Sequence, residues 1–136
     1  MNSTTITVTS QDHQRLYALA SNKAARSSET FEALAYELER AHVVEPADIP
    51  ANVVTMRSRV VVREKASARD QIYTLVYPGE EDIAVGRISI LTPLGAALIG
   101  LSQGQALSWT TRDGRTKELV VHEILYQPEA DGRFDL

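Results

Sequence analysis

This chain of 136 residues contains no cysteine, and none of its apolar runs is long enough to cross a membrane. The absence of cysteine excludes disulfides, thiolate metal sites and cysteine nucleophiles, and it fits a reducing compartment. A membrane span needs roughly 18 apolar residues in a row. The opening MNSTTITVTSQDHQ also has neither the basic nor the long apolar segment of a signal peptide. We therefore expect a cytoplasmic protein without a membrane partner.

The chain also lacks an excess of basic residues. Its net charge is -4, with four Lys and Arg against seven Asp and Glu in residues 1–50, and ten against eleven in residues 51–136. A protein that neutralises phosphates usually shows a basic face. Direct binding of nucleic acid is therefore not expected as the main activity.

Motifs of catalytic and metal sites are missing as well. His13, His42 and His122 fall in three different predicted elements, so none has a partner at the spacing of a helical metal site. The acidic run from Glu80 to Asp82 lacks the alternating ligands of a calcium loop and fits a solvated turn. We find no serine nucleophile elbow, phosphate loop or dinucleotide fingerprint. The sequence thus predicts no metal, no cofactor and no enzyme.

Two helices are predicted in the first third of the chain. Ser10 is placed to cap a helix over residues 11–20, and Ser27 or Ser28 to cap a second helix that runs to about Val43. The second helix has one apolar stripe, formed by Phe31, Leu34, Ala35, Leu38 and Ala41. Two short helices of this kind predict an antiparallel hairpin that resembles a coiled coil.

Prolines mark the boundary that follows. Pro46 and Pro50 each remove a backbone donor and bias the preceding residue away from helix. We therefore expect three parts: a helical hairpin over residues 1–45, a stiff linker over 46–52, and a second domain over 53–136.

The second domain changes to a two-residue or continuously apolar pattern, which favours strands. The Asp113-Gly114 pair predicts a tight hairpin turn between the last two. The strands are expected over residues 56–63, 70–77, 83–91, 105–111 and 116–126. The overall fold class is α+β.

One helix is expected among these strands, in the segment ISILTPLGAALIGLSQGQ over residues 88–105. Thr92 is placed to cap it, and Pro93 can be its first residue because the amide at that position needs no partner. Gly100 or Gly104 would let the chain turn away. A core stripe is expected from Leu94, Ala97, Leu98 and Leu101.

Taken in this order, the pieces resemble the Rnk family, whose members are called regulators of nucleoside diphosphate kinase and are related to the transcript-cleavage factors GreA and GreB. The likeness is densest in VVTMRSRVVVRE (53–64), TLVYPGE (74–80), LTPLGAALIGL (91–101) and ILYQPEADG (124–132). The resemblance implies an FKBP-like second domain, a twisted antiparallel sheet around one short helix. It also implies docking on RNA polymerase at the mouth of the secondary channel.

The resemblance further implies that Leu91, Thr92, Pro93 and Leu94 belong to the patch that meets the polymerase. A rigid helix start lowers the ordering cost of docking. The residues themselves leave a simpler interpretation open, in which Thr92 and Pro93 only begin a helix and Leu94 belongs to the core.

The hairpin tip bears on activity. In the cleavage factors a long coiled coil carries acidic residues that help to hold a catalytic metal ion. Here helices of about ten and fifteen residues would reach roughly 15 to 24 Å. The tip contains Lys23 and Arg26, and Glu29 is the sole acid between Ser21 and Thr30. We therefore expect no stimulation of RNA cleavage.

The resulting prediction is a non-catalytic transcription regulator that occupies the channel mouth and excludes longer coiled-coil factors. An FKBP-like peptidyl-prolyl isomerase is one alternative, although its pocket would need several aromatics and the second domain offers only Trp109, Phe134 and three scattered tyrosines. An interaction module for a different protein is another. The sequence leaves the oligomeric state open, with a monomer expected, and shows no binding site for a kinase.

Overall fold

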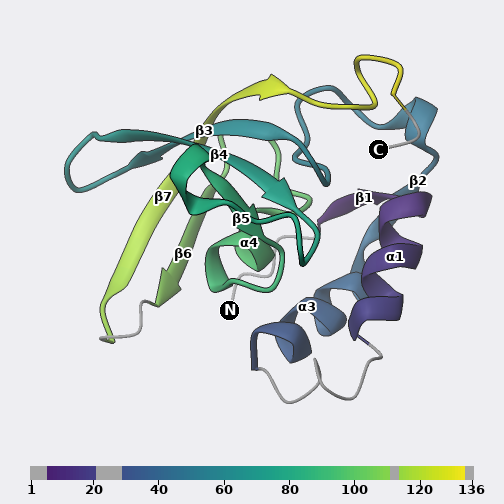
Figure 1. Ribbon diagram of the computed structural model, residues 1–136, viewed down its shortest axis with the longest axis horizontal. Coiled ribbons are helices and arrows are strands. Elements are labelled where there is room, and N and C mark those ends of the chain that lie inside the picture. The colour runs from purple at the N-terminus through teal and green to yellow at the C-terminus, as the bar shows by residue number, and fades with distance from the viewer. Residues whose placement is uncertain (1–5, 21–28, 111–113, 134–136) are drawn as a thin grey trace.

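The computed structural model describes residues 6–20, 29–110 and 114–133, and it combines a five-stranded sheet with three α-helices and a separate pair of strands (Figure 1). In chain order the elements are β1 (Thr7–Thr9), α1 (Ser10–Ala20), α3 (Glu29–Arg40), β2 (His42–Val44), a 3-10 turn (Pro46–Asp48), β3 (Arg59–Glu64), β4 (Asp70–Val76), a second 3-10 turn (Ile83–Val85), β5 (Arg87–Ser89), α4 (Pro93–Leu98), β6 (Ala106–Thr110) and β7 (Thr116–Tyr126).

The helical part begins and ends in strands. The hydroxyl of Thr9 accepts a hydrogen bond from the amide of Asp12 at 3.0 Å, so Thr9 caps α1 in place of the predicted Ser10. The second helix was predicted to continue to about Val43, which is wrong, because α3 ends at Arg40 and the chain enters β2. That strand pairs with β1 in parallel. Its two valines favour an extended backbone, and β1 supplies the partner.

The sheet has the order β5-β4-β3-β7-β6. The pairs of β3 with β4, β3 with β7 and β6 with β7 are antiparallel, whereas β5 runs parallel to β4. The expectation of a wholly antiparallel sheet is therefore wrong at this edge.

The reason lies in the segment over residues 83–91, which was predicted as one strand. The carboxylate of Asp82 accepts from the amide of Ala84 at 3.2 Å and caps a 3-10 turn. Backbone bonds between Asp82 and Arg87 then close this turn and bring the chain back alongside β4. Only Arg87–Ser89 remains as a strand.

The last two strands agree with the prediction, since β7 spans the expected residues and β6 pairs with it up to Thr110 and Thr116. Of the predicted Asp113-Gly114 turn, Asp113 lies outside the described residues.

One hydrophobic core joins the two parts of the chain. The sheet curves around α4, while α1 and α3 lie side by side beyond the edge of this layer (Figure 1). β1 lies between α1 and the sheet, and α3 contacts α4. The side chain of Phe31 lies outside the described residues. The core is formed by Ile6, Val8, Leu16, Leu34 and Leu38 from the helical part, Leu94, Leu98, Ile99 and Leu101 from α4 and its end, and Val54, Met56, Val60, Val62, Leu75, Ile88, Ile90, Leu107, Leu119 and Val121 from the sheet part.

Candidate functional site

The start of α4 is fixed by hydrogen bonds of Thr92. Its Oγ1 accepts from the amide of Gly95 at 3.0 Å and donates to the carbonyl of Ser89 at 2.7 Å. The Thr92 amide donates to the same carbonyl at 3.0 Å, and Pro93 opens the helix. The predicted cap is therefore confirmed, and it ties the helix to the end of β5.

The four residues of the predicted patch divide between surface and interior. Leu91 is 37% exposed, Thr92 is half-buried, and Leu94 is only 8% exposed and packs in the core. The side chain of Pro93 lies outside the described residues. Leu91 is therefore the most exposed of the described side chains of this patch, and Leu94 packs in the core.

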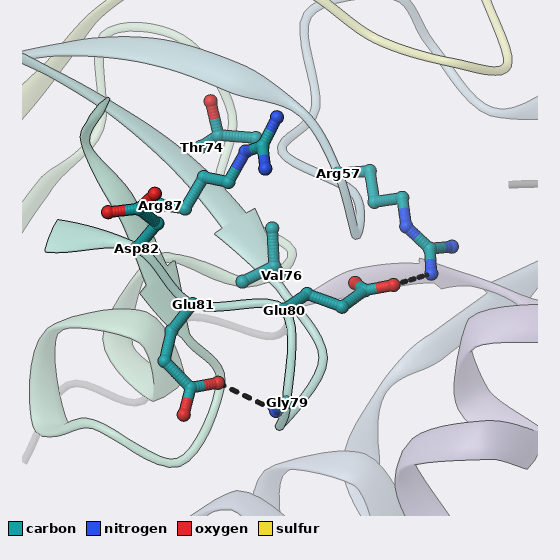
Figure 2. Close-up of a pocket in the computed structure, with 8 residues that line it drawn as sticks. All are labelled: Arg57, Thr74, Val76, Gly79, Glu80, Glu81, Asp82 and Arg87. Atoms are coloured by element: carbon teal, nitrogen blue, oxygen red, sulfur yellow. Dashed lines mark hydrogen bonds and ion pairs between the residues drawn. The ribbon is translucent and has the colours of Figure 1, made fainter. Parts of the chain in front are cut away.

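A hollow of about 540 Å³ opens beside β4 (Figure 2). In Figure 2, Arg57 and Glu80 point toward each other at one side of the hollow, and Arg87 lies beside Thr74 at the other. The lining residues are Arg57, Thr74, Val76, Gly79, Glu80, Glu81, Asp82 and Arg87. None of these side chains is aromatic, so the described part of this hollow offers nothing that resembles a proline-binding pocket.

Ion pairing organises the loop that borders the hollow. The Arg57 guanidinium donates to the Glu80 carboxylate at 2.5 Å, and the same carboxylate accepts from the Tyr77 amide at 3.2 Å. The hydrogen bond from Arg57 is the main reason that the pKa of Glu80 lies below its usual value. Glu81 accepts from the amide of Gly79 at 2.7 Å. With Asp82 capping its turn, all three acidic side chains of the predicted solvated turn serve the loop itself.

The structure does not bring the three histidines together. The Nε2 of His13 lies 2.9 Å from the carbonyl of Leu38, and that of His122 lies 3.3 Å from the Arg63 guanidinium on the sheet. His42 is exposed on β2. Over residues 6–20, 29–110 and 114–133, no three His, Asp or Glu side chains are grouped to hold a metal ion.

Other predicted features fall outside the described part of the chain. Lys23 and Arg26, which were expected at the hairpin tip, are among them, as are the side chains of Trp109 and Phe134. Within the described helices, none is long and apolar enough to span a membrane.

Sequence reasoning missed the group formed by Tyr77, Arg57 and Glu80. The guanidinium of Arg57 lies 5.2 Å from the centre of the Tyr77 ring, and that of Arg15 on α1 lies 5.8 Å from it. The turn Tyr77-Pro78-Gly79-Glu80 is a local signal for the bond between Tyr77 and Glu80. Nothing local predicts the two arginines, because they come from distant segments.

Comparison with known families divides the chain at nearly the same place as its prolines do. The family model described as "Transcription elongation factor, GreA/GreB, C-term" matches residues 49–126. A second model, described as "Rnk N-terminus", matches residues 4–44.

Individual proteins give the same result over most of the chain. It is 36% identical over 134 residues to the regulator of nucleoside diphosphate kinase of Escherichia coli K12, covering 98% of both chains. It is 31% identical over 122 residues to the transcription elongation factor GreA of Helicobacter hepaticus, covering 86% of this chain and 74% of that protein. Among solved structures, a transcription elongation factor GreA/GreB from Nitrosomonas europaea is 39% identical with a TM-score of 0.77, covering 91% of this chain and 100% of that one.

Proposed function

Since this chain belongs to the Rnk family, which is related to GreA and GreB, we propose that it binds RNA polymerase at the mouth of the secondary channel and competes there with longer coiled-coil factors. It regulates transcription by occupying this place and adds no catalytic group. The single observation that carries the absence of a catalytic group is the length of the described helices.

The described helices are short. The eleven residues of α1 and the twelve of α3 correspond to about 17 to 18 Å at the usual rise per residue. The sequence of the expected tip supports the same view, because residues 21–28 include Lys23 and Arg26 and contain no acidic residue. A hairpin of this kind blocks the channel entrance without delivering carboxylates to the polymerase active site.

The docking surface of this proposal is centred on the start of α4. Leu91 makes the apolar contact, Thr92 and Pro93 fix where it stands, and Leu94 anchors the segment in the core. Because the cap holds this segment in one conformation, little ordering is needed when the partner binds.

We propose the following division of the chain as part of the same account. Residues 1–45 form an antiparallel coiled-coil-like hairpin, 46–52 a linker, and 53–136 an FKBP-like domain, in a monomer of the bacterial cytoplasm. An effect on nucleoside diphosphate kinase would then be indirect, through transcription.

Binding to purified core polymerase tests the docking surface. In fluorescence anisotropy titrations the full-length protein should bind at micromolar concentration or below, and Leu91→Ser should weaken binding by about tenfold, as expected for an apolar contact at the centre of an interface. Leu125→Ser, a change of a comparably exposed leucine on β7, is the matched control and should bind normally. The absence of binding at micromolar concentration would refute the proposal.

A further inference from the structure

A buried carboxylate joins the helical part to the sheet. Asp12 lies in the first turn of α1 and is 2% exposed. Its Oδ2 accepts a hydrogen bond from the Met56 amide at 3.1 Å, and its Oδ1 accepts one from the Tyr77 hydroxyl at 3.2 Å. Met56 precedes β3, and Tyr77 follows β4. One side chain of the helical part therefore holds two separate segments of the sheet part.

Several charged groups surround Asp12. Arg15 comes from its own helix, and Glu129 approaches from the segment after β7, held by a hydrogen bond of 2.7 Å from Thr55. The guanidinium of Arg57 lies over the ring of Tyr77, which is the hydrogen-bond partner of Asp12 on the sheet side. The same guanidinium pairs with Glu80. The charges of Glu129 and Arg15 thus act on the pKa of Asp12 in opposite directions.

Burial is the largest influence on the pKa of the Asp12 carboxyl. Removing the group from water raises the pKa of Asp12 to about 6, and the negative charge of Glu129 adds to the rise. The hydrogen bonds from Met56 and Tyr77 and the charge of Arg15 work against it. The ionised form is therefore held at a cost, which a proton relieves.

We propose that Asp12 is a proton-operated latch, in which protonation of its carboxyl tightens the attachment of α1 to the sheet and loss of the proton loosens it. Neither the docking surface at α4 nor the short reach of the helices requires such a group. The latch concerns the attachment of the hairpin and does not depend on which partner the protein binds.

The sign follows from linkage. When α1 separates from the sheet, Asp12 enters water and regains an ordinary pKa, so the attached state binds the proton more tightly, and protons favour attachment. The contacts survive protonation, because Oδ2 still accepts from the Met56 amide while a proton on Oδ1 can be donated to the Tyr77 oxygen. Attachment is tightest below about pH 4 and is loosened as the pH rises through about 6.

Amide hydrogen exchange of Met56 in the full-length protein tests the latch, because this amide is released only when Asp12 moves away. After correction for intrinsic exchange rates, its opening constant should be about tenfold smaller at pH 5 than at pH 8, from the difference between the two pKa values. Asp12→Asn, which keeps both hydrogen bonds without a titrating group, should remove this dependence. Asp48→Asn, at an exposed position, is the matched control and should behave like the original protein.

Three results would overturn the latch. The first is a pH-independent opening constant of Met56, and the second is an unchanged dependence in Asp12→Asn. The third is an identical opening constant for the buried amide of Val121 on β7, since the helices and sheet would then open only together. Carbon-13 titration of the Asp12 carboxyl decides the matter if Asp12→Asn does not fold. The midpoint should lie near 6 and rise further in Tyr77→Phe, whereas a midpoint near 4 contradicts the proposal.

Discussion

The carbonyl oxygen of Ser89 lies against the Cα of Gly95, at a place that a Cβ on Gly95 would overlap. The end of β5 and the first turn of α4 therefore touch backbone to backbone. The cap supplied by Thr92 reaches the same two residues. This close contact fixes the direction in which the proposed docking segment leaves the sheet.

Gly95→Ala should lower the free energy of unfolding by about 1–3 kcal/mol, because the added methyl group forces the backbone of β5 and α4 apart. Alanine is the better helix former by about 1 kcal/mol, so the expected sign is opposite to that of helix propensity. Urea denaturation measures the change. Gly79→Ala is the control, since nothing lies within 4 Å of its Cβ position and only the strain of its positive φ remains. A more stable Gly95→Ala protein would show that the contact is not tight.

Loss of the cap at Thr92 should lower the free energy of unfolding by less than Gly95→Ala does. Thr92→Ala removes the acceptor for the Gly95 amide and should lower stability by about 1 kcal/mol. Thr92→Ser retains the hydroxyl and should stay close to the original protein in the same denaturation experiment. If the serine and alanine variants lose equal stability, the methyl group of Thr92 and not its hydrogen bonds holds the helix start.

The leucines on either side of this cap should separate stability from binding. Leu94→Ala leaves a cavity in the core and should cost about 2–5 kcal/mol. Leu91→Ser changes an exposed side chain and should alter stability by less than about 0.5 kcal/mol, while it weakens binding to the polymerase. Thermal and urea unfolding of the two variants, measured side by side, gives the comparison. A large loss of stability in Leu91→Ser would mean that this residue belongs to the core as well.

Much of the structure around α4 was predictable from the sequence, because the residues that define this helix are close together in the chain. Thr92, Pro93 and the apolar spacing of Leu94 and Leu98 define α4 without knowledge of the rest of the fold. The same local alternation of residue types placed β4 and β7.

Features that depend on distant partners were missed. His42–Val44 reads as the end of a helix until β1 is available to pair with it. The segment around Asp82 reads as the start of a strand, although its side chain folds it into a turn. Asp12 looks like an ordinary acidic residue in a first helical turn, and only the approach of Met56 and Tyr77 makes it a buried group.

The buried Asp12 predicts an unusual pH dependence of stability. Its folded-state pKa of about 6 exceeds the ordinary value of 3.8, so between these values the folded state binds more protons than the unfolded state. This group's contribution is therefore complete below about pH 4 and is lost as the pH rises through 6, with a size on the order of 2–3 kcal/mol. Asp12→Asn should be more stable than the original protein at pH 8 and should lose that advantage toward pH 4. Unfolding curves across this range measure the difference, and parallel pH profiles of the two proteins would contradict it.

Transcript cleavage should not respond to this protein. With backtracked polymerase complexes, its addition should leave the cleavage rate at the intrinsic level, because residues 21–28 at the expected tip contain no acidic residue. A GreA-type factor in the same assay is the positive control. Stimulated cleavage would contradict the proposal that this protein adds no catalytic group.

Competition for core RNA polymerase tests the proposed function most directly. A labelled GreA-type factor bound to the enzyme should be displaced by increasing amounts of this protein, and Leu91→Ser should need about ten times more protein for the same displacement, while Leu125→Ser should need no more than the original. If this protein and the GreA-type factor bind together without displacement, occupancy of the secondary-channel mouth is wrong.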